Sequence, residues 1–459
     1  MNFIGRAIEL KKLKSAIDSK KTSFTLIYGR RRIGKSELIK FALKQSKVVS
    51  IYYECKETAE RSNVESLCDI ISDSLNLPKL GFSTIEETLD YLFRQAINQK
   101  IVVVLDEYPY LRENIKGMDS IVQSLLDRYR DSSKLSLVLL GSYIGVMKSL
   151  IEEKNPLYGR TDAVIDLKPM DYYDSAKFYP AFSSEDKVRI YSVFGGVPYY
   201  NSFVNDKQSV KENIIRLIAS SDARFGNEVP MYLKGEISKI KNANEVFEAL
   251  AKGYSKYSDI LSQSHVSSGP TLADVLERLI SMEVIKKVSP INDEHNKKRS
   301  AYYISDNLSL FYYKYVYRYA SQMSIMDSNT FYKKYIEKQF ESEYVPSCFE
   351  EICRQYLIRM NVAGKIRPVI EKIGKYYYDD PITRTNGEFD VVTQDKNGYI
   401  FYEVKFKNSP FSKKEIMKEI EQVEQTGLSC YKYMFITRAG IENADRKDVG
   451  SVKIDKLYK

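Results

Sequence analysis

A chain of 459 residues is too long for a single hydrophobic core, so we expect two to four domains. Its 43% hydrophobic and 29% charged residues are typical of a soluble protein, and a net charge of +9 permits contact with nucleic acid without requiring it. Two histidines leave almost nothing from which to build a histidine zinc site or a Ser-His-Asp triad. The five cysteines form no Cys-x-x-Cys pair, which argues against a zinc ribbon or a disulfide framework. Any catalytic metal is therefore expected to be a hard cation held by carboxylates.

The first residues lack the apolar run of a signal peptide, and no apolar run in the chain reaches 18 residues. We therefore expect a cytoplasmic protein with no membrane association. The spacing of Leu10, Leu13 and Ile17 predicts a helix over 7–20. The elements predicted between the first strand and residue 100 are a strand at 48–53 and helices at 62–76 and 84–99.

Residues 24–36, FTLIYGRRRIGKS, carry the most informative pattern of the chain. A strand-like apolar run leads into Gly29, and Gly34, Lys35 and Ser36 complete a G-x-x-x-x-G-K-S spacing. In such a loop the glycines let backbone N–H groups surround a phosphate, the lysine reaches the β- and γ-phosphates, and the serine ligates Mg²⁺. A basic turn ahead of a surface helix is the alternative, but the apolar helix face that follows favours a nucleotide-binding loop.

This pattern predicts ATP and Mg²⁺ as the bound cofactors. The loop residues expected at the nucleotide are Gly29, Arg30, Arg31, Arg32, Ile33, Gly34, Lys35, Ser36 and Glu37. The segment IVVVLDEYPYL, beginning at Ile101, predicts a central parallel strand buried on both faces. Asp106 at its carboxyl end would hold Mg²⁺, and Glu107 would polarise the attacking water. An ordinary strand end is the alternative, but a position about 70 residues after the phosphate loop favours the catalytic interpretation.

Another buried strand is predicted at Leu135–Leu140, and Ser142 follows it with a side chain that could sense the γ-phosphate. The turn PLYGR then offers Arg160, which could stabilise phosphoryl charge in its own subunit or across an interface. A surface arginine is the alternative. Residues 170–225 are predicted to be helical, with an interruption at GGVPYY (195–200).

Residues 243–305 predict three helices followed by a two-stranded hairpin, the pattern of a winged helix-turn-helix. Its third helix carries Asp274 and Glu277 against Arg278, whereas groove-reading helices supply positive donors. The positive charge lies on the wing, at Lys286, Lys287, Lys297, Lys298 and Arg299. Phosphate contact by the wing is one interpretation, and a packing or interaction module is the favoured one. Residues 308–345 predict helices with a tyrosine-lined core, although their aromatic rings could instead stack on bases.

From residue 346 a second α/β pattern begins, with a helix that carries Glu350. Strands at 388–393 and 399–406 follow, joined by the hairpin signal DKNG. Alternation sends Glu403 and Lys405 to one face of the second strand, while Asp390 interrupts the apolar residues of the first. Glu350, Asp390 and Glu403 could hold a second Mg²⁺ or Mn²⁺, and Lys405 could activate a water. The alternative is a structural ion pair on an exposed sheet face. A helix at 413–426 and a strand at 431–437 complete this unit.

The segments FIGRAIEL, YGRRRIGKS, VVLDEYPYL, LLGS, PLYGR and GGVPYY resemble, in order, the blocks of archaeal-type P-loop ATPases of the AAA/STAND group. Many members carry a winged helix and then a restriction-endonuclease-like domain of the PD-(D/E)xK type. The segments GEFDVV and YEVKF of this sequence resemble the core of that domain. The resemblance implies that Arg6 and Pro198 lie near the adenine and Arg160 near the phosphates. The sequence departs from the full nuclease pattern in one respect, because no proline-aspartate pair can be placed ahead of Asp390.

The expected fold is therefore α/β: a P-loop NTPase sheet, a helical lid, a winged helix-turn-helix and a restriction-endonuclease-like α/β domain. The expected boundaries are 1–168 for the ATPase core, 169–236 for the lid, 237–306 for the winged helix, 307–345 for a helical connector and 346–459 for the last domain. The favoured function is an ATP-regulated nuclease that acts on DNA, with RNA as the less favoured substrate, in defence or genome maintenance; a homo-oligomer is a further expectation. The alternative is an ATP-dependent signalling or scaffold protein that binds nucleic acid or protein without cutting.

Overall fold

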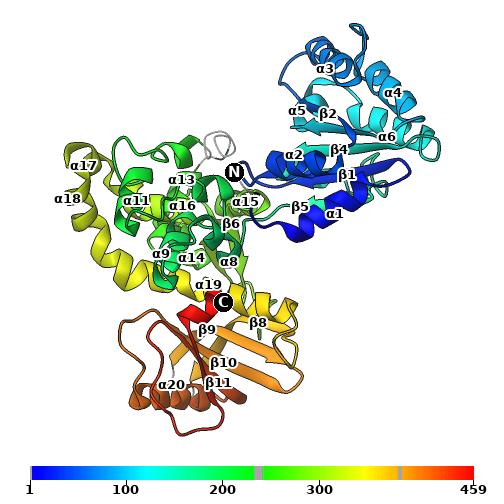
Figure 1. Cartoon of the computed structure of the whole chain (residues 1–459). Coiled ribbons are helices and arrows are strands. Elements are labelled where there is room, and N and C mark those ends of the chain that lie inside the picture. Colours follow the sequence, from blue (N-terminus) through cyan, green and yellow to red (C-terminus); the bar gives the residue numbers. More distant parts are fainter. Residues whose placement is uncertain (1–2, 232–239, 241, 381–384) are drawn as a thin grey trace. The chain divides into compact units, whose positions relative to one another are not determined.

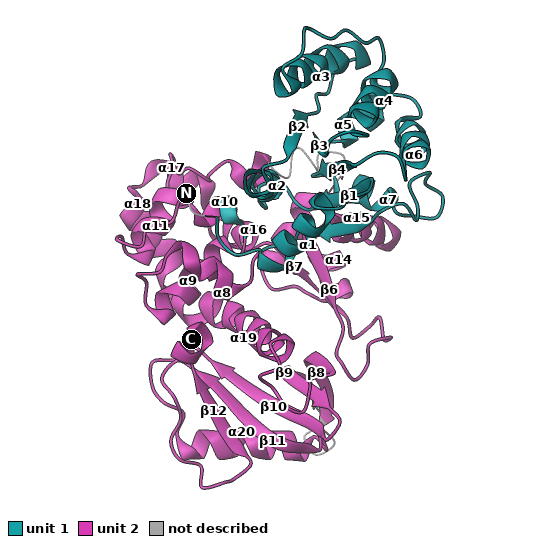
Figure 2. Ribbon diagram, turned by 45° about the vertical axis from the view of Figure 1, so that its right-hand side comes forward, with its two compact units in different colours: residues 1–169, 197–199 teal, residues 170–196, 200–459 magenta. Residues whose placement is uncertain are grey.

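The computed structural model describes residues 3–231, 240, 242–380 and 385–459. They form two compact units, which Figure 2 colours separately. The first unit comprises Met1–Pro169 with Val197–Tyr199, and the second comprises Met170–Gly196 with Tyr200–Lys459. The boundary expected between residues 236 and 237 lies outside the described residues. Within the described ranges, no helix is long and apolar enough to cross a membrane.

The first unit is built on a five-stranded parallel sheet in the order β2-β3-β4-β1-β5 (Figure 1). Its strands are β1 (Ser23–Tyr28), β2 (Val49–Glu54), β3 (Ile101–Asp106), β4 (Leu135–Gly141) and β5 (Ala163–Asp166). Every residue of β1, β3 and β4 is buried, as continuous apolar runs require when helices cover both faces. The sequence predicted four of these strands, and it missed β5 because four residues carry little periodicity.

Seven helices surround this sheet. They are α1 (Ala7–Ile17), α2 (Lys35–Ser46), α3 (Glu60–Leu75), α4 (Ile85–Gln95), α5 (Pro109–Asn114), α6 (Met118–Arg128) and α7 (Ile144–Ser149). One hydrophobic core joins Leu67, Leu92 and Leu125 of three helices to Leu105 and Leu137 of the sheet. A capping box at Thr84 fixes where α4 begins, because the threonine accepts from the Glu87 amide and the Glu87 side chain accepts from the cap.

The second unit begins with helices α8 (Tyr172–Ser175), α9 (Ser184–Phe194) and α11 (Val210–Leu217). The short α10 (Pro198–Asn201) precedes α11, and its first two residues belong to the first unit. Three helices and a hairpin follow, as the sequence predicted: α13 (Ala243–Ala251), α14 (Tyr257–Gln263), α15 (Gly269–Ser281), β6 (Ile285–Val288) and β7 (Ala301–Ile304). We refer to residues 243–305 as the hairpin module. Its strands β6 and β7 are antiparallel.

A tyrosine-rich helical region leads from the hairpin module to the last domain. It contains α16 (Asn307–Phe311), α17 (Ala320–Ile325) and α18 (Ser328–Tyr332), separated and followed by π-helical turns, and then the long α19 (Val345–Val362). Phe311, Tyr315 and Tyr344 are fully buried, with ring centroids 5.0–5.7 Å apart. These rings form a packed core, as predicted, rather than a solvent-facing stacking surface.

The C-terminal domain contains a mixed sheet in the order β12-β11-β10-β9-β8. Its strands are β8 (Lys372–Asp380), β9 (Thr385–Asp395), β10 (Gly398–Lys405), β11 (Cys430–Thr437) and β12 (Val449–Lys453). Helix α20 (Lys413–Gln425) lies along this sheet (Figure 1). Its Ile416, Ile420 and Val423 belong to one hydrophobic core with Phe401 and Phe435 of the sheet. The sequence did not predict β8 or β12; β8 carries three consecutive tyrosines and so lacks the alternation of a half-buried strand.

Candidate functional site

The strand order of the first sheet sets the site, because β4 lies between β1 and β3. The carboxyl ends of three adjacent parallel strands therefore meet at one edge, with Gly29, Ser142 and Asp106 at those ends. Gly29 has φ 155°, and a Cβ there would lie 2.4 Å from the carbonyl oxygen of Leu167. Gly34, with φ 92°, is the N-cap of α2. Any other residue at these two positions would strain or block the loop.

The Lys35 side chain is buried inside the loop, with 5% of its surface exposed. Its Nζ donates hydrogen bonds to the carbonyl oxygens of Gly29 (2.9 Å) and Arg30 (3.1 Å) and to Ser142 Oγ (2.7 Å). A buried ammonium at the N-terminus of a twelve-residue helix is the arrangement that binds phosphate groups. The loop therefore fits a nucleoside triphosphate.

Two side chains whose oxygen atoms suit a hard metal ion, Ser36 and Asp106, meet next to Lys35. Ser36 Oγ donates to Asp106 Oδ2 at 2.7 Å, and the hydroxyl of Tyr52 donates to the same carboxylate oxygen. Burial and the bond to Asp106 raise the pKa of Tyr52, so its hydroxyl stays protonated as a donor. Hydroxyl and carboxylate oxygens are the ligands that Mg²⁺ prefers, so Ser36 and Asp106 fit the predicted metal role. The sequence analysis missed Tyr52, which the neighbouring strand β2 brings to this carboxylate.

Glu107 follows Asp106 with φ 54°, a left-handed backbone that a side chain seldom adopts outside a constrained site. Its carboxylate accepts from the Ser142 amide (3.1 Å) and from Ser142 Oγ (2.5 Å). Ser142 thus connects the lysine of the phosphate loop to the glutamate, through a single hydroxyl. This geometry places Ser142 between the two groups that flank a γ-phosphate in the predicted reaction.

Two further segments reach the phosphate loop. Arg6 donates from Nη2 to the Ile33 carbonyl at 3.3 Å, and the ring of Pro198 lies beside Gly34. The guanidinium of Arg32 lies 4.3 Å from the Tyr199 ring centroid. Arg6 and Pro198 are therefore both at the loop, and their contact with adenine remains a prediction. Of the other predicted loop residues, Arg30 and Ile33 are buried, Arg31 donates to the Tyr143 hydroxyl, and Glu37 lies in the first turn of α2.

The predicted place of Arg160 requires a correction. Its guanidinium makes two hydrogen bonds of 2.8 Å to the carboxylate of Asp127 at the end of α6. Two residues later, Asp162 accepts from the amide of Phe24, at the beginning of β1. Arg160 therefore lies at the amino-terminal edge of the sheet, a strand length of about 17 Å from the phosphate loop. A contact with phosphates in its own subunit is not what the structure shows; a contact across an interface remains a prediction.

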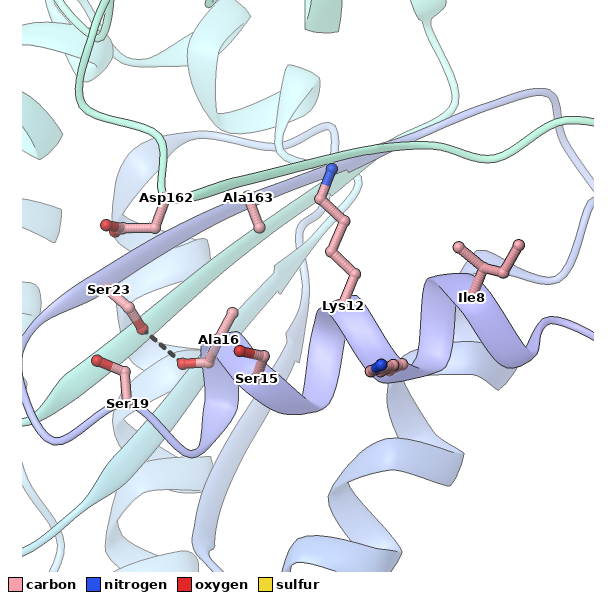
Figure 3. Close-up of a pocket in the computed structure, with 9 residues that line it drawn as sticks. Ile8, Lys12, Ser15, Ala16, Ser19, Ser23, Asp162 and Ala163 are labelled. Atoms are coloured by element: carbon pink, nitrogen blue, oxygen red, sulfur yellow. Dashed lines mark hydrogen bonds between the residues drawn. The ribbon is translucent and has the colours of Figure 1, made fainter. Parts of the chain in front are cut away.

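A pocket of about 490 Å³ also lies on that side of the first unit, since its lining includes Ser23 and Asp162. Figure 3 shows the side chains that line it. It is lined from α1, β1 and β5 by residues that include Lys12, Ser23 and Asp162. Ser23 Oγ donates to the Ala16 carbonyl (2.9 Å), and Lys12 Nζ donates to the Val164 carbonyl (2.6 Å). None of its lining residues belongs to the phosphate loop. We therefore assign it no part in nucleotide binding.

A second group of charged residues lies on β8, β9, β10 and α19 of the C-terminal domain. The pairing of β9 with β10 matches Val391 to Tyr402, and Asp390 and Glu403 are the next residues along the two strands. The charge of Asp390 contributes to the raised pKa of Glu403, so the two carboxylates lie near each other. Lys405 Nζ lies 2.6 Å from Glu403 Oε1. The sheet thus brings together the Asp, Glu and Lys that the sequence analysis selected.

Burial raises the pKa of Glu403 and of Glu350 to about 7, and the charge of Asp390 adds to the shift in both. The three carboxylates therefore share one electrostatic environment. Within the part of the chain that the structure describes, no group of three or more His, Cys, Asp or Glu side chains is arranged to hold a metal ion. Lysines contact the carboxylates instead, so the second metal site remains a prediction.

Two basic residues of this group were not predicted. Lys375 Nζ lies 3.0 Å from Asp390 Oδ1, and Arg354 Nη1 donates to the Asp390 carbonyl at 3.0 Å. Lys375 was missed because β8 was not predicted as a strand. Arg354 also pairs at 2.8 Å with Glu351, whose pKa falls to about 2 because the charges of Lys286 and Arg354 outweigh the effect of burial. An arginine four residues after Glu350 on one helix was the available signal.

Comparison with known proteins identifies the first unit. Residues 3–204 match the family described as an ATPase domain predominantly from Archaea. The chain contains an archaeal-type ATPase domain. Residues 312–420, from the tyrosine-rich helices to α20, match a family described as archaeal and bacterial proteins of unknown function.

The whole chain also has a relative. It is 28% identical over 458 residues to an uncharacterized protein of Methanocaldococcus jannaschii, and the match covers 97% of this chain and 98% of that protein. Among solved structures, the Walker-type ATPase PABY2304 of Pyrococcus abyssi shares the fold, with a TM-score of 0.51, 19% identity, and coverage of 68% of this chain and 96% of that one. The ORC2 protein of Aeropyrum pernix covers 70% of this chain and 96% of its own at 13% identity, but its TM-score of 0.43 is too low to bear on function.

Replacing the loop lysine tests nucleotide binding by the ATPase domain. Lys35→Ala should abolish tight ATP binding, because it removes the buried point charge of the loop. Isothermal titration calorimetry with ATP and Mg²⁺ measures this, with Lys44→Ala, at an exposed position of α2, as the matched control. Wild-type affinity in Lys35→Ala would refute the assignment of the loop.

Glu107→Gln separates binding from hydrolysis. The amide keeps the size of the side chain and leaves Ser36 and Asp106 intact, so the protein should still bind ATP. Its steady-state hydrolysis should fall on the order of 100-fold or more, because the carboxylate that accepts the proton is lost. An unchanged hydrolysis rate would show that another group positions the water.

The raised pKa values of Glu350 and Glu403 predict a pH dependence of stability. Between about pH 4.5 and 7 the folded chain binds more protons at these groups than the unfolded chain does, so the free energy of unfolding should fall as pH rises. The loss is at most about 3 kcal/mol for each carboxyl. Urea unfolding of Glu403→Gln across this range should show a smaller decline than wild type, and Glu421→Gln, an exposed change on α20, is the control. A decline that is equal in all three proteins would contradict the prediction.

Proposed function

We propose that the chain is an ATP-hydrolysing switch whose nucleotide state regulates a C-terminal, metal-dependent nuclease domain that acts on DNA. One observation carries the proposal: Asp390, Glu403 and Lys405 of the C-terminal sheet lie close to Glu350 of α19, in the same chain as an archaeal-type ATPase domain. We interpret the C-terminal domain as restriction-endonuclease-like, of the PD-(D/E)xK type, and the hairpin module as a winged helix.

In the ATPase domain, the phosphate loop and the N-terminus of α2 hold the phosphates, and Lys35 neutralises their charge. Ser36 and Asp106 would hold Mg²⁺, which offsets charge that develops on the phosphate oxygens. Glu107 orients the attacking water and takes up its proton. Ser142, which contacts both Lys35 and Glu107, is the group through which loss of the γ-phosphate reaches the glutamate.

In the C-terminal domain, Asp390 and Glu403, with Glu350, would hold Mg²⁺ or Mn²⁺, which supplies an activated water for phosphodiester hydrolysis. The Asp390 carboxylate is 46% exposed and the Lys405 side chain 50% exposed, so both can be reached from solvent. Lys405, anchored 2.6 Å from Glu403, can meet a phosphate oxygen of the substrate. The raised pKa of Glu403 fits a carboxyl whose charged form a bound cation would stabilise.

Contacts of the hairpin module do not favour direct reading of DNA by its third helix. Arg278 on α15 pairs with Asp274 at 3.2 Å, and Lys286 on β6 pairs with Glu351 of α19 at 3.0 Å. Both charges are thus engaged within the second unit. DNA rather than RNA is the proposed partner of the C-terminal domain, and assembly into a homo-oligomer would give Arg160 its place at a neighbouring nucleotide.

One observation favours a second function, that of an ATP-dependent signalling or scaffold protein that binds without cutting. Asp390 contacts Lys375 at 3.0 Å and Glu403 contacts Lys405 at 2.6 Å, so two of the three carboxylates are engaged by lysines. Carboxylates satisfied in this way need no cation for stability. The two functions differ in whether nucleic acid is cleaved.

A cleavage assay separates them. Plasmid and single-stranded DNA are incubated with purified protein and Mg²⁺ or Mn²⁺, with and without ATP. Asp390→Ala and Lys405→Ala should each reduce cleavage at least about 100-fold while ATP hydrolysis is retained, because metal binding or charge stabilisation is lost. Lys407→Ala, which removes a lysine paired with Glu415, is the matched control and should cut as wild type does. Cleavage that persists in Asp390→Ala would reject this site, and no cleavage by any protein would favour the binding function.

A further inference from the structure

The connection between β6 and β7, residues 289–300, packs on the edge strand of the C-terminal sheet; we call it the wing. The Ile291 amide donates to the Lys375 carbonyl at 2.8 Å, and Asn292 exchanges side-chain hydrogen bonds of 2.8 and 3.0 Å with the backbone of Tyr377. The Ile291 side chain belongs to the hydrophobic core of the C-terminal domain. The hairpin module therefore covers β8, the strand that bears Lys375.

A chain of alternating charges runs from the hairpin module to the candidate nuclease site. Lys256, just before α14, lies 2.8 Å from Glu388; Glu388 lies 3.7 Å from Lys375; and Lys375 lies 3.0 Å from Asp390. The ring of Tyr303 on β7 lies 5.7 Å from Lys375 Nζ. The pairing of β8 with β9 shifts between Gly374 and Tyr376, where Asp390 and Val391 of β9 together lie opposite Lys375 alone, so the extra residue of this bulge is on β9 beside the lysine.

We propose that Lys375 is a positioning residue that occupies Asp390 in place of a divalent cation, and that the hairpin module sets how firmly it does so. The inference rests on the metal site of the proposed function. A lysine ammonium and a divalent cation compete for the same carboxylate oxygens and repel each other. Glu388 draws Lys375 away from Asp390, and Lys256 weakens that pull because it shares Glu388.

This arrangement predicts the effect of each substitution on Mn²⁺ affinity. Lys375→Met removes the competing charge and should raise the affinity at least about tenfold. Lys375→Arg keeps the charge and should bind Mn²⁺ as wild type does. Lys372→Met is the matched control, because Lys372 lies on the same strand and pairs with Glu294 of the wing at 2.8 Å. This control should leave the affinity unchanged.

Two substitutions away from Asp390 should act in opposite directions. Lys256→Met removes one of the two lysines that pair with Glu388, so Glu388 attracts Lys375 more strongly. Lys375 then interacts less with Asp390, and Mn²⁺ affinity should rise severalfold. Glu388→Gln ends the pull on Lys375 and should lower the affinity severalfold. A merely structural role of these residues would lower the melting temperature in both variants without giving Mn²⁺ effects of opposite sign.

The test measures Mn²⁺ binding to the full chain without nucleotide, by electron paramagnetic resonance of the free ion, with a thermal melt for each variant. Binding that is lost in Asp390→Ala is assigned to the C-terminal site. Equal affinity in wild type and Lys375→Met would overturn the role of Lys375 while the metal site stands. No Asp390-dependent binding in any variant, Lys375→Met included, would instead refute the metal site. If Lys375→Met does not fold, Lys256→Met and Glu388→Gln decide the question by the sign of their effects.

Discussion

The ATPase domain depends on the buried ammonium of Lys35. A charge that is 5% exposed is costly unless oxygen atoms solvate it, and here the acceptors include two loop carbonyls and the hydroxyl of Ser142. Those acceptors come from the segments that follow β1 and β4, which are neighbours in the sheet. The strand order is therefore a requirement of the site as well as of the fold, since it brings Ser142 to the lysine and to Glu107 at once.

The C-terminal domain meets the same difficulty with the opposite charge. Its strands bury Glu403 and its long helix buries Glu350, which raises the pKa of each to about 7. Lysines reduce the cost: Lys405 pairs with Glu403 and Lys375 with Asp390. Such carboxylates can be neutralised by a bound proton, by a lysine ammonium or by a metal cation, and the local structure determines which of the three is bound.

The sequence allowed site residues to be predicted where they belong to a short local pattern. The meeting of the phosphate loop, Asp106 and Ser142 could be predicted because each lies at the carboxyl end of an apolar strand, and parallel strands end at one edge of a sheet; their roles in the reaction stay predictions. Tyr52 and Lys375 could not, because their roles come from strand pairing rather than from local spacing. Lys375 also lies on a strand whose three tyrosines hide its periodicity. Arg160 was misplaced because the short strand β5, which begins three residues later, was not predicted, so the direction of the preceding turn was unknown.

The contacts around the C-terminal carboxylates lie within the second unit. The hairpin module and the C-terminal sheet belong to one compact unit, joined by the backbone hydrogen bond at Ile291, by a shared hydrophobic core and by ion pairs at Lys256 and Lys286. The contacts of Lys375 and Asp390 described above therefore lie inside this unit. In the proposed switch, its ion pairs are the contacts most open to change, because ion pairs exchange partners at lower cost than packed side chains do.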